Sequence, residues 1–151
     1  MKAISIIVVF FGVVAIVIGA VFVGLGTARN IELTQAMQAE KVTLGVEQAE
    51  AQAGEVIDSL SEAMKAGNTI REHRHAIAPT YDDLLGGKQY DPTNPKDLTY
   101  AQAMNLENYL YLAVVAFGLT QSVMASGVFM IISGLALVGT GVVLYKVIQK
   151  V

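Results

Sequence analysis

The side chains best suited to metal or proton chemistry are Glu72, His73 and His75, because carboxylates and imidazoles are common metal ligands and proton carriers. Two positions along an α-helix turn the side-chain direction by about 200°. His73 and His75 would therefore point apart on a helix and could not hold one ion together. Cationic groups are also favourable near a helix C-terminus. We expect these three residues to form a solvated, charge-mixed helix end.

Oxygen-bearing side chains recur at three-residue spacing in Asp91, Asn94 and Asp97, which is a second possible cation site. The segment lacks the glycine and the terminal bidentate glutamate of an EF-hand loop. Gly86-Gly87-Lys88 is too short for a phosphate-binding loop, and the sequence has no nucleophile elbow. The chain also has no cysteine, which excludes thiolate metal sites and disulfides. We therefore predict no catalytic residue, no bound metal and no cofactor.

The distribution of charged residues divides the chain into an acidic central segment and two uncharged runs. All 13 acidic residues lie between Glu32 and Glu107, and an uncharged run flanks them on each side. The first run, Ile4–Gly26, has 23 residues, and the second, Asn108–Tyr145, has 38. A helix of roughly 20 apolar residues crosses the hydrocarbon core of a bilayer. Both runs are therefore long enough to be transmembrane helices.

The second run is too long for one straight crossing, since 38 helical residues extend about 57 Å against a core of roughly 30 Å. Its polar residues cluster at positions 120–126. We therefore place transmembrane helices at 4–26 and 123–145, a helical lead at 108–122, and an acidic, mostly helical domain at 27–107. The predicted fold is an all-α membrane protein, with two antiparallel transmembrane helices and an extracytoplasmic domain between them.

Both runs carry glycines at seven-residue spacing. This spacing keeps small residues on one face of a supercoiled helix, and in lipid such a face lets two helix backbones approach closely. The alternative is a chance spacing, because glycine is common in membrane helices. We predict that the transmembrane helices pack along these residues: Gly12, Gly19, Gly26, Gly127, Gly134 and Gly141.

Basic residues near the ends of the spans predict the orientation. Lys2 precedes the first span and Lys146 and Lys150 follow the second, whereas the intervening segment carries seven basic and 13 acidic residues. Lysine and arginine next to a span favour the cytoplasmic side. We expect both termini in the cytoplasm and the central domain outside. Arg29 is a basic residue close to the outer end of the first span, which argues against this orientation. The first apolar run exceeds the 7–15 residues of a signal peptide, so we interpret it as an uncleaved anchor.

Several local elements are expected between the spans. The β-branched segment Lys41–Val46 favours a short extended piece. Apolar residues on one face predict a helix that starts at Gly54 and stops before Pro79. Thr80 fits a capping box that opens a short turn. Thr99 fits a second capping box, which would start a helix that continues into the second span.

Several short stretches match a known family pattern: Ala39–Thr43; the spaced Ala63, Ala66, Ile70 and His73; Thr80–Leu84; Val114–Gly118; and Val123, Met124 and Gly127. In their order and two-span layout they resemble a family of small two-span bacterial membrane proteins, often labelled aromatic ring-opening dioxygenases. The chain departs from that family at Ala78-Pro79 and in the loop Asp91–Asp97.

The resemblance implies a two-span fold in the bacterial plasma membrane. The chemistry of the label does not follow from the residues. Non-haem iron dioxygenases use two histidines and a carboxylate that converge on the metal, and the two histidines of this chain diverge.

Taken together, the sequence predicts a protein without enzymatic activity. Charged residues within membrane spans are the usual mark of a transport pathway, and neither run contains one. The segments outside the spans at the two ends are short, so we do not expect signalling through the chain itself. We expect an accessory or structural subunit of a membrane assembly, and the alternative is an extracytoplasmic binding or sensor module that acts on another membrane protein. The expected partners are the lipid bilayer and other membrane subunits or further copies of the chain, and not nucleic acid.

Overall fold

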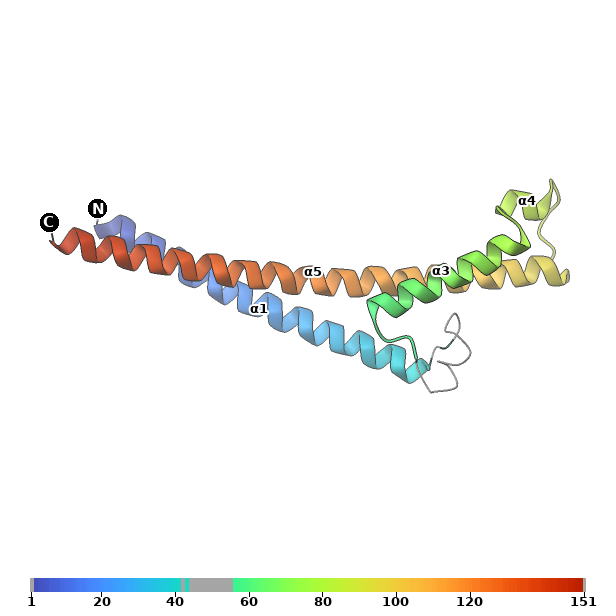
Figure 1. The fold of residues 1–151 in the computed structure, drawn as a ribbon, viewed down its shortest axis with the longest axis horizontal. Coiled ribbons are helices and arrows are strands. Elements are labelled where there is room, and N and C mark those ends of the chain that lie inside the picture. Colours follow the sequence, from blue (N-terminus) through green and yellow to red (C-terminus); the bar gives the residue numbers. More distant parts are fainter. Residues whose placement is uncertain (1, 42, 44–55, 151) are drawn as a thin grey trace. The chain divides into compact units, whose positions relative to one another are not determined.

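A computed structural model describes residues 2–41, 43 and 56–150 of the chain. In this part of the chain every regular element is a helix (Figure 1). The helices are α1 (Lys2–Glu40), α3 (Leu60–Ile77), α4 (Tyr81–Leu85) and α5 (Pro95–Lys150). The all-α class is therefore confirmed. Of the extended piece predicted at Lys41–Val46, positions 42 and 44–46 lie outside the described residues.

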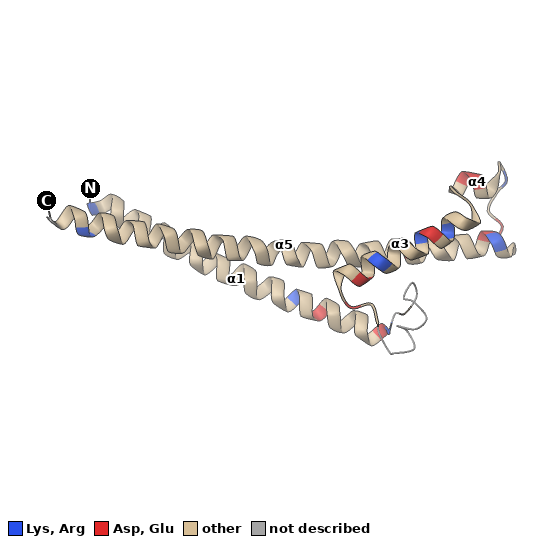
Figure 2. Cartoon of the chain, in the orientation of Figure 1, with Lys and Arg blue, Asp and Glu red and all other residues tan. Residues whose placement is uncertain are grey.

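Helices α1 and α5 are both long and apolar enough to cross a membrane. Their 39 and 56 residues correspond to about 58 and 84 Å, well beyond the roughly 30 Å of a hydrocarbon core. Figure 2 shows the uncharged stretches of both helices in tan. Each helix therefore has length left over after one crossing.

Helix α1 continues 14 residues past the predicted end of the first span at Gly26. The residues from 27 to 40 contain no glycine or proline and include several alanines, glutamines and glutamates, which are good helix formers. The helix ends at Glu40, and the next residue, Lys41, has a positive φ of 49°. The end of the apolar run is therefore not the end of the helix.

Helix α5 begins at Pro95, four residues before the start that was predicted at Thr99. Proline is favoured at the first helical position because its missing N–H has no helical partner there. Asn94 precedes it, and the side-chain oxygen of Asn94 accepts a hydrogen bond of 2.9 Å from the N–H of Lys96. The hydroxyl of Thr99 donates to the carbonyl of Pro95 at 2.7 Å. The capping box predicted at Thr99 is therefore wrong, whereas the predicted continuation into the second apolar run is confirmed.

Helix α3 begins at Leu60 rather than at Gly54, because Ser59 and Glu62 form a capping box. The N–H of Glu62 donates to the hydroxyl of Ser59 at 3.3 Å, and the N–H of Ser59 donates to the carboxylate of Glu62 at 3.1 Å. The amide of Asp58 donates to the same carboxylate at 3.0 Å. These hydrogen bonds hold the pKa of Glu62 below its ordinary value, with the bond from Asp58 the largest contribution.

The turn after α3 opens at Thr80 as predicted, but the hydrogen bonds there are those of an N-cap and not of the full capping box that was predicted. Helix α3 ends at Ile77, two residues before Pro79. Thr80 then caps α4, since its hydroxyl accepts a hydrogen bond of 3.1 Å from the N–H of Asp83. The hydroxyl also donates to the Asp83 carboxylate at 2.7 Å. Gly86 closes the turn with a φ of 54°, in the left-handed region that favours glycine.

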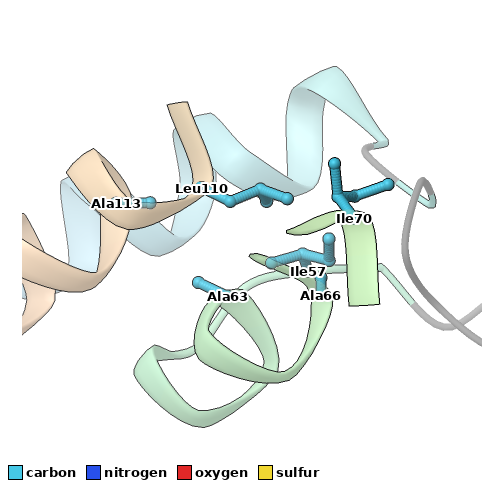
Figure 3. Packing of buried hydrophobic residues seen from close by; sticks show 6 residues of the cluster. All are labelled: Ile57, Ala63, Ala66, Ile70, Leu110 and Ala113. Atoms are coloured by element: carbon cyan, nitrogen blue, oxygen red, sulfur yellow. The ribbon is translucent and has the colours of Figure 1, made fainter. Parts of the chain in front are cut away.

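The chain divides into two compact units, and α1 and α5 contribute to both. Unit 1 consists of Met1–Ile31 and Leu119–Val151, and unit 2 is Glu32–Gly118. Unit 2 has a small apolar core built from the segment before α3, from α3 and from α5. Figure 3 shows this cluster, which comprises Ile57, Ala63, Ala66, Ile70, Leu110 and Ala113. The alanines leave room for α3 and α5 to pack closely.

Candidate functional site

The most constrained contacts of unit 1 involve the glycines with seven-residue spacing. A Cβ atom on Gly12 would lie 2.7 Å from the carbonyl oxygen of Gly134, and one on Gly19 would lie 2.6 Å from that of Gly127. The reverse contacts, from Gly134 to Gly12 and from Gly127 to Gly19, are both 2.6 Å. Real Cβ atoms essentially never come within 3.0 Å of another heavy atom. A larger residue at any of these positions would therefore force the backbones apart.

The same row continues at both ends of unit 1. A Cβ atom on Gly26 would lie 3.1 Å from the carbonyl of Thr120, and one on Gly141 would lie 3.0 Å from the carbonyl of Ser5. The side chain of Ser5 is 1% exposed. Ser5 stands seven residues before Gly12, so the periodicity that picked out the glycines could also have identified it. The structure thus places all six predicted packing glycines in one row, together with Ser5 and Thr120; we call this row the glycine seam.

Branched side chains cover the glycine seam from the opposite helix. Val138 Cγ2 would lie 2.8 Å from a Cβ on Gly12, and Ile16 Cγ1 would lie 2.7 Å from one on Gly134. Ile131 and Val23 cover Gly19 and Gly127 in the same way. In a helix the β-branched residues have one strongly preferred rotamer, so they lose little further freedom when they pack against a flat glycine surface. The contact combines close backbones with rigid side chains.

Hydrogen bonds between the helices lie near one end of the glycine seam. The hydroxyl of Thr120 donates to the side-chain oxygen of Asn30 at 3.0 Å. The hydroxyl of Thr27 approaches the sulfur of Met124 at 3.3 Å. Such polar side chains are used as links between helices in an apolar environment. Unit 1 is therefore joined by close packing along its length and by polar contacts near this end.

Two other glycines of the same helices differ from those of the seam. A Cβ atom on Gly24 of α1 or on Gly139 of α5 would meet no heavy atom within 4 Å. These positions face away from the helix–helix contact. They provide matched controls, because they share the helix and the residue type but not the contact.

The histidine pair lies on α3 in unit 2, and the two rings have different surroundings. His75 Nε2 is 3.1 Å from Nη2 of Arg74. His73 lines an open groove of about 460 Å³ between α3 and α5. The groove is otherwise lined by Ile70, Ile77, Thr99, Gln102, Ala103 and Leu106. Among the described residues, no three His, Cys, Asp or Glu side chains gather in a way that could hold a metal ion.

The acidic loop after α4 uses its oxygen atoms to organise its own backbone. Oδ1 of Asp91 accepts hydrogen bonds from the N–H and the hydroxyl of Thr93, at 2.8 and 2.6 Å. The N–H of Asp91 donates to the carboxylate of Asp97 at 3.1 Å. The hydrogen bond from the Thr93 hydroxyl is the main reason why the pKa of Asp91 lies below its ordinary value. These contacts shape the start of α5 and explain the spacing of the oxygen-bearing residues.

Arg74 forms a largely buried polar cluster in unit 2. Its Nε donates to the carboxylate of Glu107 at 2.7 Å, and its Nη1 donates to the hydroxyl of Tyr100. The guanidinium also lies 5.1 Å from the centre of the Tyr100 ring. Tyr100 is fully buried, and the ion-pair side chains of Arg74 and Glu107 are 13% and 10% exposed. The bond to Glu107 is the main cause of a raised pKa for Arg74.

A second polar contact joins α3 to α5 nearer the start of α3. The hydroxyl of Tyr111 donates to the side-chain oxygen of Asn68 at 2.7 Å, and Arg71 donates to the same oxygen at 3.1 Å. The Arg71 guanidinium lies 5.8 Å from the centre of the Tyr111 ring. The ring also covers Gly67, where a Cβ would meet it at 3.4 Å. Both polar contacts hold α3 on α5, which is a structural role.

Comparisons of this chain with protein-family models, with curated proteins and with solved structures found no match. The resemblance to a two-span bacterial family consequently rests on the short motifs alone and stays a prediction.

Proposed function

We propose that the chain is an integral membrane protein in which α1 and α5 cross the bilayer once each as an antiparallel pair. The glycine seam is the observation that carries this proposal. Its contacts pair low-numbered residues of α1 with high-numbered residues of α5, from Ser5 with Gly141 to Gly26 with Thr120. In lipid, close approach of backbones at small residues is a main source of helix association, since burial of apolar area contributes little there.

The outward surface of unit 1 supports a lipid environment. Phe10 is 61% exposed, Phe129 is 70% exposed and Ile132 is 62% exposed. Extended apolar surfaces of this kind are rare on soluble monomers and mark contact with a membrane or another protein. Figure 2 shows these stretches without charged residues. Lipid tails would cover such side chains without a cost in free energy.

We place both termini in the cytoplasm and unit 2 on the opposite side of a bacterial plasma membrane. Lys2 and Lys146 stand just outside the uncharged stretches, with no acidic residue in either terminal segment. The segment between the spans carries the entire acidic complement of the chain. Basic residues next to spans are retained in the cytoplasm, which favours this orientation.

The role that fits best is that of a non-enzymatic accessory or structural subunit. The buried polar groups of unit 2 bind one another and join α3 to α5, as in the pair Arg74 and Glu107. On α5, Tyr109, Leu112 and Val115 are 68%, 63% and 64% exposed and follow one another at three-residue spacing. An apolar strip of this kind is a suitable contact surface for another membrane subunit or a second copy.

Purification of the tagged chain from its own membranes in a mild detergent tests this role. We expect a stoichiometric partner, which is either a second protein or a second copy. Leu112→Gln should reduce its recovery severalfold. Met64→Gln, on α3 at 39% exposure, serves as the matched control and should not reduce recovery. Recovery of a lone monomer from membranes that contain the intact assembly would contradict the accessory role.

The groove beside His73 supports a second candidate, a binding or sensor module. It opens between α3 and α5 and has mainly apolar walls with a few polar groups, as small binding sites do. Ala103→Phe would fill the groove. If a partner or ligand binds reversibly and Ala103→Phe abolishes this binding while Leu112→Gln does not, the sensor role is favoured over the accessory role.

A further inference from the structure

Two apolar grooves lie at the end of unit 1 that contains Lys2 and Lys146. The first groove has a volume of about 260 Å³ and is lined by Ser5, Ile6, Val9, Val142, Tyr145 and Lys146. The second has about 340 Å³ and is lined by Ile4, Ser5, Leu144, Val147 and Ile148. Among the residues whose side chains the structure describes, a basic residue and a tyrosine line the first groove but not the second. Ser5 is common to both.

The wall of the first groove is mainly apolar, although Ser5 is one of its lining residues. The hydroxyl of Ser5 donates to the carbonyl of Lys2 at 2.8 Å, so its polar hydrogen is turned to the backbone. Ile6 and Val142 are 59% and 41% exposed, which leaves the groove open to the surroundings. An occupant of the groove should therefore be a flexible apolar chain.

The charged residues beside the groove indicate which polar group the bound molecule should carry. Lys146 belongs to the lining, and Lys2 is the first residue of α1, about one helical turn before Ser5 of the same lining. No acidic residue occurs in Met1–Ile31 or Leu119–Val151. Tyrosine is enriched at the level of lipid head groups, and Tyr145 is 37% exposed next to Lys146. Basic pockets between membrane helices bind anionic head groups.

We infer that this groove binds one anionic phospholipid, with an acyl chain between Ile6, Val9 and Val142 and the phosphate at Lys146. The inference rests on the proposed membrane location of unit 1. The second groove, whose described lining residues are all uncharged, should accept lipid without preference for the head group.

The full chain has no tryptophan, so one introduced residue reports on each groove. Tyr145→Trp places the reporter in the first groove, and Leu144→Trp places it in the second, one residue away. Each variant is reconstituted into vesicles of phosphatidylcholine with a small fraction of brominated phosphatidylglycerol or brominated phosphatidylcholine. For Tyr145→Trp we expect quenching at about fivefold lower amounts of the anionic lipid, the ratio expected for one lysine near the head group. Adding Lys146→Gln should remove the preference.

The outcomes separate the lipid site from the membrane location. Equal quenching by both lipids at both positions would overturn the lipid site and leave the membrane location intact. A preference of the same size at Leu144→Trp, or one that survives Lys146→Gln, would also overturn it. Such a result would reflect general surface charge. Absence of quenching by either lipid would overturn the membrane location and the lipid site together.

Discussion

Replacement of a glycine in the seam by alanine should destabilise the helix pair, whereas the same change outside the seam should not. In Gly19→Ala the new methyl would lie 2.6 Å from the carbonyl oxygen of Gly127 and 2.8 Å from the side chain of Ile131. Ordinary van der Waals contact begins at 3.4 Å. The nearest atom belongs to the backbone and cannot rotate away, so the helices must separate locally. In Gly24→Ala the methyl meets nothing within 4 Å.

The change in the free energy of unfolding is the sum of two opposing contributions. Overpacking a close contact costs about 1–3 kcal/mol. Alanine is favoured over glycine within a helix by about 1 kcal/mol, and this gain is the same at both positions. Gly19→Ala should therefore lower the free energy of unfolding by about 1 kcal/mol, while Gly24→Ala should raise it by about 1 kcal/mol. The difference of about 2 kcal/mol corresponds to a difference in Tm of roughly 4–8 °C for a chain of this size.

Thermal unfolding in detergent micelles, followed by circular dichroism, measures this difference. The double variant Gly19→Ala with Gly127→Ala gives a sharper test, because both methyls open the same contact. Its effect should be smaller than the sum of the two single effects, as expected for contacting residues. Equal Tm values for Gly19→Ala and Gly24→Ala would refute the reasoning. So would additive effects in the double variant, since they would mean that the two glycines act independently.

Three further predictions concern orientation and unit 2. In intact cells, a cysteine at Lys88 should react with a membrane-impermeant maleimide and one at Gln149 should not; the opposite pattern would reverse the topology. The lowered pKa of Glu62 gives stability that is present above the ordinary glutamate pKa and is lost as pH falls through the lowered folded-state pKa. Unfolding measured against pH should therefore lose part of its acid dependence in Glu62→Gln, and an unchanged profile would contradict this. Glu107→Ala should cost about 3 kcal/mol in chemical unfolding, because it leaves Arg74 without its carboxylate, and a loss below about 1 kcal/mol would show that the pair contributes little.

Much of the fold follows from charge and periodicity in the sequence. The uncharged runs predicted two helices able to span a membrane, and the structure has them. The end of α1 could not be found in this way, because hydropathy marks the end of an apolar run and not the end of a helix. Residues after Gly26 keep a high helix propensity, so the helix continues to Glu40. At the start of α5, Pro95 and Asn94 supplied a stronger start signal than Thr99.

The sequence predicted site residues only where they recur at a regular spacing. The seven-residue spacing identified the glycines, and applied one step further it would have included Ser5. The ion pair of Arg74 with Glu107 joins residues 33 positions apart on different helices, and no local pattern predicts which arginine meets which acid. The position of Glu107 was the one available hint. It is the last acid before a long uncharged run, where an unpaired charge would be costly.

The central claim, an antiparallel membrane hairpin closed by the glycine seam, is tested most directly by cysteine cross-linking in native membranes. The chain has no cysteine of its own. At one end of the glycine seam, Val9 packs on Gly141 and Val138 packs on Gly12. Toward the other end, Val23 packs on Gly127 and Met124 packs on Gly26.

Two double-cysteine variants should cross-link rapidly within one chain through a short bifunctional maleimide. One replaces Val9 and Val138, and the other replaces Val23 and Met124. The exchanged pairs, Val9 with Met124 and Val23 with Val138, are separated by about 14 residues of helix, or roughly 21 Å, and should not cross-link. The cross-linked product should run as a monomer. Efficient cross-linking of the exchanged pairs, or cross-links found only between two chains, would contradict the antiparallel hairpin.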